Sequence, residues 1–387
     1  MVRLASKMNN IVIGLSLEDN SMKSAIYNAL SNIMFRACNT INIKAKANSS
    51  RQFPYEIEVI AENLYVPWAM DISNEGKLYF TERSGAIRII ENSKLRPQPL
   101  ITLPAPFVSE GEGGLMGIAL DPNHSQNRYM YVMYSYAEGN RIYNRVVRLV
   151  ESNNRASINR VLLDKIPGGP IHNGGRLKIG PDKKLYITTG DAGNPALAQD
   201  SSSTAGKILR IELDGSIPKD NPISNSSVYS LGHRNPQGLA WNSRNVLYAS
   251  EHGQTAHDEI NIIKPGANYG WPLVQGDETS TQVVTQKPLI HSGEVTWAPS
   301  GITFVDQGPW QGKLLIACLR GQQLLAISLN GNGTVVRNVE SLFKDEYGRL
   351  REVIQGRDGS IYLTTNNRDG RGNPRMADDK IIRLIPK

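Results

Sequence analysis

The chain has 387 residues, of which 40% are hydrophobic and 20% charged, with 35 glycines and 21 prolines. This composition supplies enough apolar material for a packed core and excludes an intrinsically disordered protein. The 43 basic and 36 acidic residues give a net charge of +7. Because the basic residues are scattered, we expect no nucleic-acid groove. No apolar run approaches the roughly 18 residues of a transmembrane helix, so we expect no membrane span.

Residues 1–52 differ from the remainder of the chain. They are rich in Asn, Ser, Lys and Ala, and Met22-Lys23, a weakly apolar stretch and Ala45-Lys46-Ala47 resemble the parts of a secretory signal. We expect either a poorly ordered N-terminal extension or a degenerate export signal there, with one folded domain over 53–387. Cys38 falls in the extension, whereas Cys318 lies in an apolar run and is expected to be a buried, inert thiol.

Beyond the extension, the chain repeats one pattern six times: two short apolar or alternating runs joined by a polar turn. Equivalent positions of the second runs are Tyr79, Tyr131, Tyr186, Tyr248, Leu315 and Tyr362. They are 52, 55, 62, 67 and 47 residues apart, whereas common four-stranded propeller blades repeat every ~40–50 residues. Short runs bounded by Gly, Asp, Asn and Pro are typical of strands and turns, and no capped helix-length pattern interrupts them.

The recurrence predicts an all-β fold, a six-bladed β-propeller with four-stranded antiparallel blades. A closed ring leaves few exposed sheet edges. A pair of β-sandwiches is the alternative, but it explains the turns without explaining the recurrence. In a propeller, the loops beside the inner strands surround a central mouth, so functional residues are expected in those loops.

Two glycine-rich motifs precede predicted inner strands. The segment 168–176 contains His172, which can take up a proton near neutral pH. The segment 232–238 contains Arg234 and Asn235, and an arginine offers planar paired donors to carboxylate or quinone oxygens. The alternatives are a histidine bonded to backbone and an arginine paired with an acidic side chain.

Three further segments could bind ligands. Glu251–Gln254, followed by acidic residues, could hold Ca²⁺ through carboxylates and backbone carbonyls, or could be a solvated loop. Arg349 and Arg351 alternate onto one face of a strand, where they would need an anion unless both lie in water. The glycines of segment 110–115 allow the backbone to approach a ligand closely.

Together these residues resemble the soluble, pyrroloquinoline-quinone (PQQ)-dependent aldose and glucose/sorbosone dehydrogenases. The resemblance runs from about Tyr55 to Ile385. The motifs that carry it are E-G-E-G-G-L at 110–115, I-H-N-G-G-R at 171–176, G-H-R-N-P-Q-G at 232–238, E-H-G at 251–253, D-E-I-N-I-I-K-P-G-A-N-Y-G-W-P at 258–272, A-P-S-G at 298–301 and R-L-R-E at 349–352. Members of this family are six-bladed propellers, in agreement with the repeat.

The resemblance implies a reaction and its catalytic residues. His172 matches the family's general base, which takes the proton of the sugar's anomeric hydroxyl while hydride passes from C1 to the quinone. Arg234 would stabilise the negative charge that develops on the quinone, and Asn235 would contact the same side of the cofactor. An aldose would thus become a lactone, with the electrons passed to an external acceptor, and the family suggests an extracytoplasmic location.

The resemblance also implies how the cofactors are held. Arg320, Arg349 and Arg351 would pair with the carboxylates of PQQ, and Thr296 falls where the family has a cofactor-contacting threonine. Backbone carbonyls of Gly253 and Gln254 would bind a Ca²⁺ ion that also polarises the quinone.

Four positions depart from the pattern of many family members. Glu112 replaces Gln, which would place a carboxylate beside the cofactor. Arg320 replaces Lys, Gln254 replaces Pro, and His252 replaces Gln. None of these changes removes the proposed base or the arginine pair.

Two other functions compete with sugar oxidation. A calcium-dependent propeller lactonase would need several side-chain carboxylates or amides around one metal. A non-catalytic propeller that binds a protein partner would be expected to lose His172 or the arginines, and all of them are present.

Overall fold

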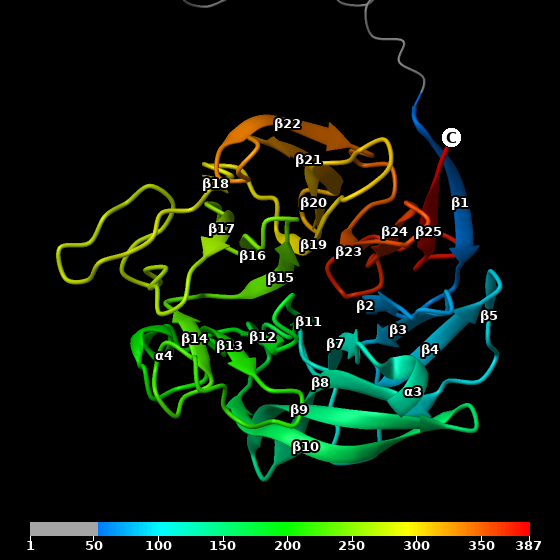
Figure 1. Cartoon of the computed structure of the whole chain (residues 1–387), viewed down its shortest axis with the longest axis horizontal. Coiled ribbons are helices and arrows are strands. Elements are labelled where there is room, and N and C mark those ends of the chain that lie inside the picture. The colour runs from blue at the N-terminus through cyan, green and yellow to red at the C-terminus, as the bar shows by residue number, and fades with distance from the viewer. Residues whose placement is uncertain (1–52) are drawn as a thin grey trace, which may run out of the picture. The chain divides into compact units, whose positions relative to one another are not determined.

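The computed structural model describes residues 53–387. The predicted extension over 1–52, with its export-signal features and Cys38, lies outside the described residues. From Tyr55 to Lys387 the chain forms a six-bladed β-propeller of antiparallel blades (Figure 1). The architecture predicted from the repeat is confirmed.

Five of the six blades are each made of strands that are consecutive in the sequence, and the blades are numbered in chain order. Blade 1 contains β2 (Pro67–Ile72), β3 (Leu78–Glu82), β4 (Ala86–Glu91) and β5 (Lys94–Leu95), with β6 (Ile101–Thr102) also paired to β4. Blades 2 and 3 contain β7 (Leu115–Leu120), β8 (Tyr129–Glu138), β9 (Arg141–Ser152) and β10 (Arg155–Pro167), then β11 (Leu177–Ile179), β12 (Leu185–Thr189), β13 (Lys207–Ile211) and β14 (Val228–Leu231). Blades 4 and 5 contain β15 (Pro236–Trp241), β16 (Leu247–Glu251), β17 (Glu259–Ile263) and β18 (Ile290–His291), then β19 (Pro299–Phe304), β20 (Lys313–Cys318), β21 (Gln323–Leu329) and β22 (Val336–Leu342).

Blade 6 joins the two ends of the propeller. Its strands β23 (Leu350–Gln355), β24 (Ile361–Thr365) and β25 (Ile381–Pro386) are completed by β1 (Tyr55–Ala61), which pairs antiparallel with β25. Because the first strand of the propeller supplies the outermost strand of the last blade, backbone hydrogen bonds close the ring.

The repeated tyrosines have a common structural role. All six repeat positions lie on the second strand of their blades, and Tyr79, Tyr131 and Tyr248 are fully buried. The hydroxyl of Tyr131 donates to Asp121 at 2.6 Å, and that of Tyr186 donates to Asp182 at 2.9 Å. In both blades the acceptor comes from the turn before the second strand, so the motif buries an aromatic ring while its polar end stays hydrogen-bonded.

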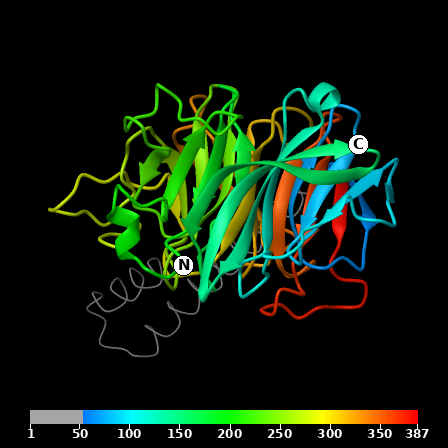
Figure 2. The same ribbon diagram turned by 90° about the horizontal axis from the view of Figure 1, so that it is seen from below.

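The inner strands, β2, β7, β11, β15, β19 and β23, surround the centre of the ring (Figure 1). Seen edge-on, the long strands β9 and β10 lie across the outside of the propeller, and loops emerge at both ends of the strands (Figure 2). Helix is confined to two single turns, α3 (His124–Asn127) and α4 (Ala196–Gln199), within residues 53–387. In this range no helix is long and apolar enough to cross a membrane.

The hub is filled by a buried ion pair rather than by apolar side chains alone. Arg176 is 1% exposed; its guanidinium pairs with Glu352, donates to the Gln237 carbonyl at 2.9 Å and lies 4.5 Å from the ring centre of Trp68. A Cβ at Gly301 would lie within 1.9 Å of a Glu352 carboxylate oxygen. The glycine of the A-P-S-G motif therefore makes room for this ion pair.

Cys318 is buried, as predicted. Burial raises the pKa of its thiol, which keeps the thiol protonated and unreactive.

Candidate active site

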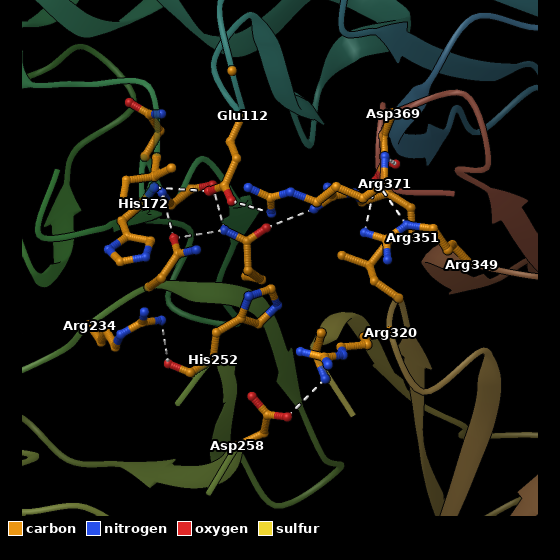
Figure 3. Close-up of a pocket in the computed structure, with 18 of the residues that line it drawn as sticks. Glu112, His172, Arg234, His252, Asp258, Arg320, Arg349, Arg351, Asp369 and Arg371 are labelled. Carbon is orange, nitrogen blue, oxygen red and sulfur yellow. Dashed lines mark hydrogen bonds and ion pairs between the residues drawn. The ribbon is translucent and has the colours of Figure 1, made fainter. Parts of the chain in front are cut away.

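A cavity of about 530 Å³ opens where the inner strands begin, and loops of all six blades line it. All ten residues predicted from the sequence lie in this lining: Glu112, His172, Arg234, Asn235, Gly253, Gln254, Thr296, Arg320, Arg349 and Arg351. The structure thus brings the separate motifs to one place (Figure 3).

His172 is held in a defined orientation by Asp191. Its Nδ1 lies 2.7 Å from Asp191 Oδ1, and Asp191 is fully buried. The carboxylate also accepts the Trp271 indole N–H at 2.8 Å and the Gly193 amide at 2.8 Å. Burial opposes ionisation of Asp191, but the bonds from His172, Gly193 and Trp271 keep its pKa below the ordinary value. A charged Asp191 fixes the ring, and Nε2 is the nitrogen left for a substrate.

The backbone of His172 is also held in place. Its φ is 56°, in the left-handed region, and its N–H donates to Glu112 Oε2 at 2.9 Å. The other carboxylate oxygen of Glu112 pairs with Arg371 at 2.6 Å. Burial works against ionisation of Glu112, but the His172 amide and Arg371 together lower its pKa below the usual range. The carboxylate that departs from the family pattern is therefore charged and already paired.

Arg234 shares a neighbour with the His172–Asp191 pair. Its guanidinium carbon lies 5.3 Å from the ring centre of Trp271, the same indole that donates to Asp191. One Nη reaches the His252 carbonyl at 3.4 Å, whereas the buried Nε has no hydrogen-bond partner among the residues that the structure describes. Burial lowers the pKa of Arg234 despite the nearby Asp191 and Glu251 carboxylates. This cation is desolvated and incompletely bonded.

The two arginines around β23 differ in their charge partners. Arg349 is paired with Asp369 through Nε at 2.9 Å and Nη2 at 2.8 Å. Arg351 instead donates to the neutral side chains of Gln237 at 2.8 Å and Ser300 at 3.3 Å, and its buried Nε has no hydrogen-bond partner in the described part of the chain. Burial lowers the pKa of Arg351 to about 9, so it remains a cation at pH 7. The sequence did not reveal that Arg349 has a carboxylate partner of its own.

The loop between β16 and β17 forms another wall of the cavity. The carboxylate of Asp258 accepts backbone N–H groups of Gly253 at 3.0 Å, Trp297 at 2.7 Å and Ala298 at 2.9 Å, which orders the loop beside Gln254. A Cβ at Gly253 would lie 1.9 Å from the Ala256 carbonyl oxygen, so this close turn requires glycine.

Other predicted residues have local partners. Thr296 donates its hydroxyl to the Thr255 carbonyl at 2.7 Å, and Asn235 accepts the Gly174 amide at 3.1 Å. The imidazole of His252 lines the cavity, and its Nε2 is buried without a partner. Burial lowers the pKa of His252 to about 4, so it is neutral at pH 7.

The lining is strongly cationic. Six arginines and three carboxylates contribute to it, which leaves three uncompensated positive charges: the arginines are Arg83, Arg234, Arg320, Arg349, Arg351 and Arg371, and the carboxylates are Glu112, Asp258 and Asp369. Within residues 53–387 no cluster of three or more His, Cys, Asp or Glu side chains is arranged to hold a metal ion. The net positive charge of this lining is electrostatically suited to an anionic ligand.

Comparison with known proteins shows the family to which the chain belongs. The family model described as Glucose / Sorbosone dehydrogenase matches residues 64–382. The chain belongs to the glucose/sorbosone dehydrogenase family.

Named members of the glucose/sorbosone dehydrogenase family resemble the chain over most of its length. The aldose sugar dehydrogenase YliI of Escherichia coli is 32% identical over 341 residues, covering 81% of this chain and 91% of its own. The quinoprotein glucose dehydrogenase B of Acinetobacter calcoaceticus is 34% identical over 318 residues, covering 71% of this chain and 66% of its own. The PQQ-bound structure of the Streptomyces coelicolor aldose sugar dehydrogenase is 37% identical with a TM-score of 0.78, covering 86% and 98% of the two chains. The three named relatives of this chain are sugar dehydrogenases. This member of the family is therefore an oxidoreductase.

Sequence reasoning missed several residues of the site in this family member. Asp191, Asp369 and Arg371 were not predicted, although each closely follows the second strand of its blade, β12 or β24. In an antiparallel hairpin, a residue after the second strand lies at the same end as one before the first. The positions just after the second strand of each blade could therefore have been used to predict further residues of the site.

Proposed function

We propose that this enzyme oxidises aldose sugars at C1 to lactones, with PQQ and Ca²⁺ as cofactors and an external electron acceptor. The observation that carries the proposal is one cavity in which a His–Asp pair and incompletely bonded arginines face the same space. The E. coli and Streptomyces relatives, described as aldose sugar dehydrogenases, support the choice of substrate class.

The cavity has the charge and the open donors that PQQ requires. Its excess of three positive charges matches a tricarboxylate, and Nε of Arg351 is a buried donor with no partner among residues 53–387. A buried donor without a partner costs free energy, which a ligand carboxylate or carbonyl would recover. Arg351, Arg349 and Arg320 would hold the carboxylates, and Thr296 and Asn235 would contact the cofactor rim.

His172 would act as the general base. With Nδ1 bonded to Asp191, Nε2 takes the proton of the C1 hydroxyl as the C1–O bond gains double-bond character and the C1 hydrogen leaves with its electron pair. When bound, PQQ supplies the two-electron acceptor for that hydride. Asp191 stabilises the imidazolium, and Arg234 supplies a desolvated positive charge next to the site. The sugar has then lost one proton and one hydride, which gives the lactone.

Ca²⁺ would bind through backbone oxygens rather than through a side-chain cluster. Hard cations accept carbonyl ligands, and Gly253 and Gln254 lie on the loop ordered by Asp258. Asp258 contributes a negative charge to the same wall. A cation there would add to the electrostatic stabilisation of the bound quinone.

Reconstitution tests the proposal directly. Purified protein is loaded with PQQ and CaCl₂, its absorption spectrum is recorded, and an aldose is added with or without a dye as acceptor. We expect the bound quinone to be reduced by the sugar and reoxidised by the dye, with activity lost on chelation of Ca²⁺. A spectrum that sugar leaves unchanged, together with cofactor-free hydrolysis of a lactone, would contradict it.

A further inference from the structure

A second, smaller cavity of about 190 Å³ adjoins the candidate active site beside blades 5 and 6. Its lining is Arg320, Gln322, Gly348, Arg349, Asn367, Arg371, Gly372, Asn373 and Arg375, a set we call the arginine annex. Arg320, Arg349 and Arg371, which line the main cavity in Figure 3, also line the annex, whereas Arg375 and Asn373 line only the annex. The annex is thus a side chamber that shares one wall with the active site.

The annex has an unbalanced positive charge. Four arginines line it and no carboxylate does. Arg349 is neutralised by Asp369 and Arg371 by Glu112, both of which lie in the lining of the main cavity. Arg375 donates to the backbone carbonyls of Glu346 at 2.7 Å and Asp345 at 3.3 Å, which orient the guanidinium but carry no full charge.

Arg320 has no ion-pair partner either: within residues 53–387, no carboxylate lies within 4.0 Å of the charged nitrogens of Arg320 or Arg375. Arg375 therefore retains its full charge at the annex, and Arg320, which would also hold PQQ, retains it in the apoprotein, beside the neutral amides of Gln322, Asn367 and Asn373. Fixed cations with amide donors form the donor set that recognises a carboxylate, phosphate or sulfate.

Two glycines allow the loops that line the annex to pack closely. A Cβ at Gly372 would lie 2.5 Å from the Asn367 carbonyl oxygen and 2.9 Å from Cδ of Arg349. Gly348 has a φ of 72°, and a Cβ there would lie 2.3 Å from the Asn367 side-chain oxygen. Larger residues at these positions would displace Asn367 or Arg349, so the shape of the annex depends on both glycines.

We propose that the arginine annex binds the anionic group of a small molecule that reacts at the neighbouring active site. The shared chemistry is a carboxylate, phosphate or sulfate, and it could belong to an acidic sugar or to an anionic electron acceptor. The inference rests on the proposed dehydrogenase function, because that function supplies both kinds of reactant. The inference goes beyond the dehydrogenase function by assigning Arg375 and Asn373, which do not line the main cavity, to a separate anion site.

Anion binding is tested first without turnover. Crystals of the apoprotein and of the PQQ-loaded protein are soaked in selenate, whose anomalous signal locates the ion. We expect selenate in the annex in both forms, and its loss in Arg375→Gln. Selenate confined to the main cavity, or displaced from the annex by PQQ, would overturn the proposal, because the annex would then be part of the cofactor site.

Kinetics with matched pairs of reactants then identify the source of the anion. One arm compares ferricyanide with a cationic phenazine dye on the same sugar, and the other compares glucuronate with glucose using the same dye. Loss of one charge-assisted contact in Arg375→Gln should lower the preference for the anionic reactant, as a ratio of kcat/KM, by about tenfold in one arm. Unchanged ratios in both arms would overturn the proposal.

The matched control is Arg357→Gln, which removes the same charge from the turn between β23 and β24, at the opposite end of the blade strands. It should leave both ratios as they are, whereas a general effect of net charge would shift them equally in both variants. If no sugar is oxidised with any acceptor, the dehydrogenase proposal fails, while the selenate result still decides whether the annex binds anions.

Discussion

The imidazole of His172 and the carboxylate of Asp191 are hydrogen-bonded, with Nδ1 2.7 Å from Oδ1, although they come from different loops of blade 3. His172 precedes β11 and Asp191 follows β12, so the antiparallel β11–β12 hairpin places them at the same end. Trp271 of blade 4 donates to the same carboxylate at 2.8 Å. The pair is therefore fixed by the contact between two blades as well as by its own hairpin.

The His172–Asp191 pair gives the first prediction. His172→Ala should lower kcat by a factor of ~10²–10⁴, the usual contribution of a general base, while the affinity for PQQ changes little. Asp191→Asn should lower kcat by a smaller factor. The base remains, but no carboxylate then fixes the tautomer of His172 or stabilises its imidazolium form. Stopped-flow reduction of the bound quinone measures the step directly. Equal rates in His172→Ala and the wild type would remove His172 from this role.

The second prediction concerns the charge partners of Arg349 and Arg351. Arg351 has no carboxylate partner within 4.0 Å in residues 53–387, whereas Arg349 pairs with Asp369. Arg351→Gln should therefore weaken PQQ binding by about 100-fold, and Arg349→Gln by about tenfold, in line with charge-assisted hydrogen bonds of ~1.5–3 kcal/mol. Titration of each apoprotein with PQQ gives both constants. The reverse order would show that Asp369 does not neutralise Arg349.

The third prediction separates the two roles of Glu112. Glu112→Gln keeps an acceptor for the His172 N–H but loses the ion pair with Arg371, which is 58% exposed. Since exposed ion pairs contribute only ~0–1 kcal/mol, kcat should fall less than threefold. Glu112→Ala removes the acceptor and frees a backbone held at a positive φ, so kcat should fall at least tenfold. Similar kcat values in the two variants would argue against positioning by Glu112.

The fourth prediction concerns ring closure. The carboxylate of Asp379, just before β25, accepts the Thr365 hydroxyl at 3.1 Å and the amides of Arg368 at 3.3 Å and Val66 at 3.3 Å. Asp379→Ala leaves these buried donors without an acceptor, which should cost about 3 kcal/mol of unfolding free energy. Urea denaturation of the apoprotein measures the loss. Asp306→Ala, at an exposed aspartate in the turn between β19 and β20, is the control and should change stability by less than 0.5 kcal/mol in the usual range for surface sites.

The fifth prediction is a pH dependence of stability at Glu259. Burial, with help from Glu251, raises the pKa of Glu259 to about 7 from an ordinary value of 4.5. Between these values the folded state binds more protons than the unfolded state, so this group lowers stability as the pH rises from 4.5 to 7.

Glu259→Gln removes that titration. Its Tm relative to the wild type should therefore be higher at pH 8 than at pH 5, as measured by thermal unfolding of the apoprotein at both pH values. Glu294→Gln, at a side chain that is 92% exposed, should show no such difference. A constant offset between Glu259→Gln and wild type at the two pH values would contradict the assignment.

The fold could be predicted from the sequence because its determinants are local. Each blade has a turn between two short strands, and five of the six carry a tyrosine at the repeat position of the second strand, as in Tyr131, whose hydroxyl donates to Asp121. Such features recur every 47 to 67 residues and reveal the number of blades. Part of the candidate site was accessible for a similar reason, because His172, Arg234 and Asn235 lie in glycine-rich motifs beside predicted inner strands, whereas Thr296 and Arg320 came only from the family resemblance. All ten candidate residues line one cavity.

The charge partners in the site were decided only by the tertiary structure. Glu112 and Arg371 are 259 positions apart, in blades 2 and 6, and they meet at 2.6 Å only because β1 closes the ring against β25. Likewise, the sequence showed two arginines around β23 but not that Asp369 neutralises one of them. Hydrophobic alternation and turn chemistry act over a few residues, whereas an ion pair depends on where the closed ring brings two distant loops together.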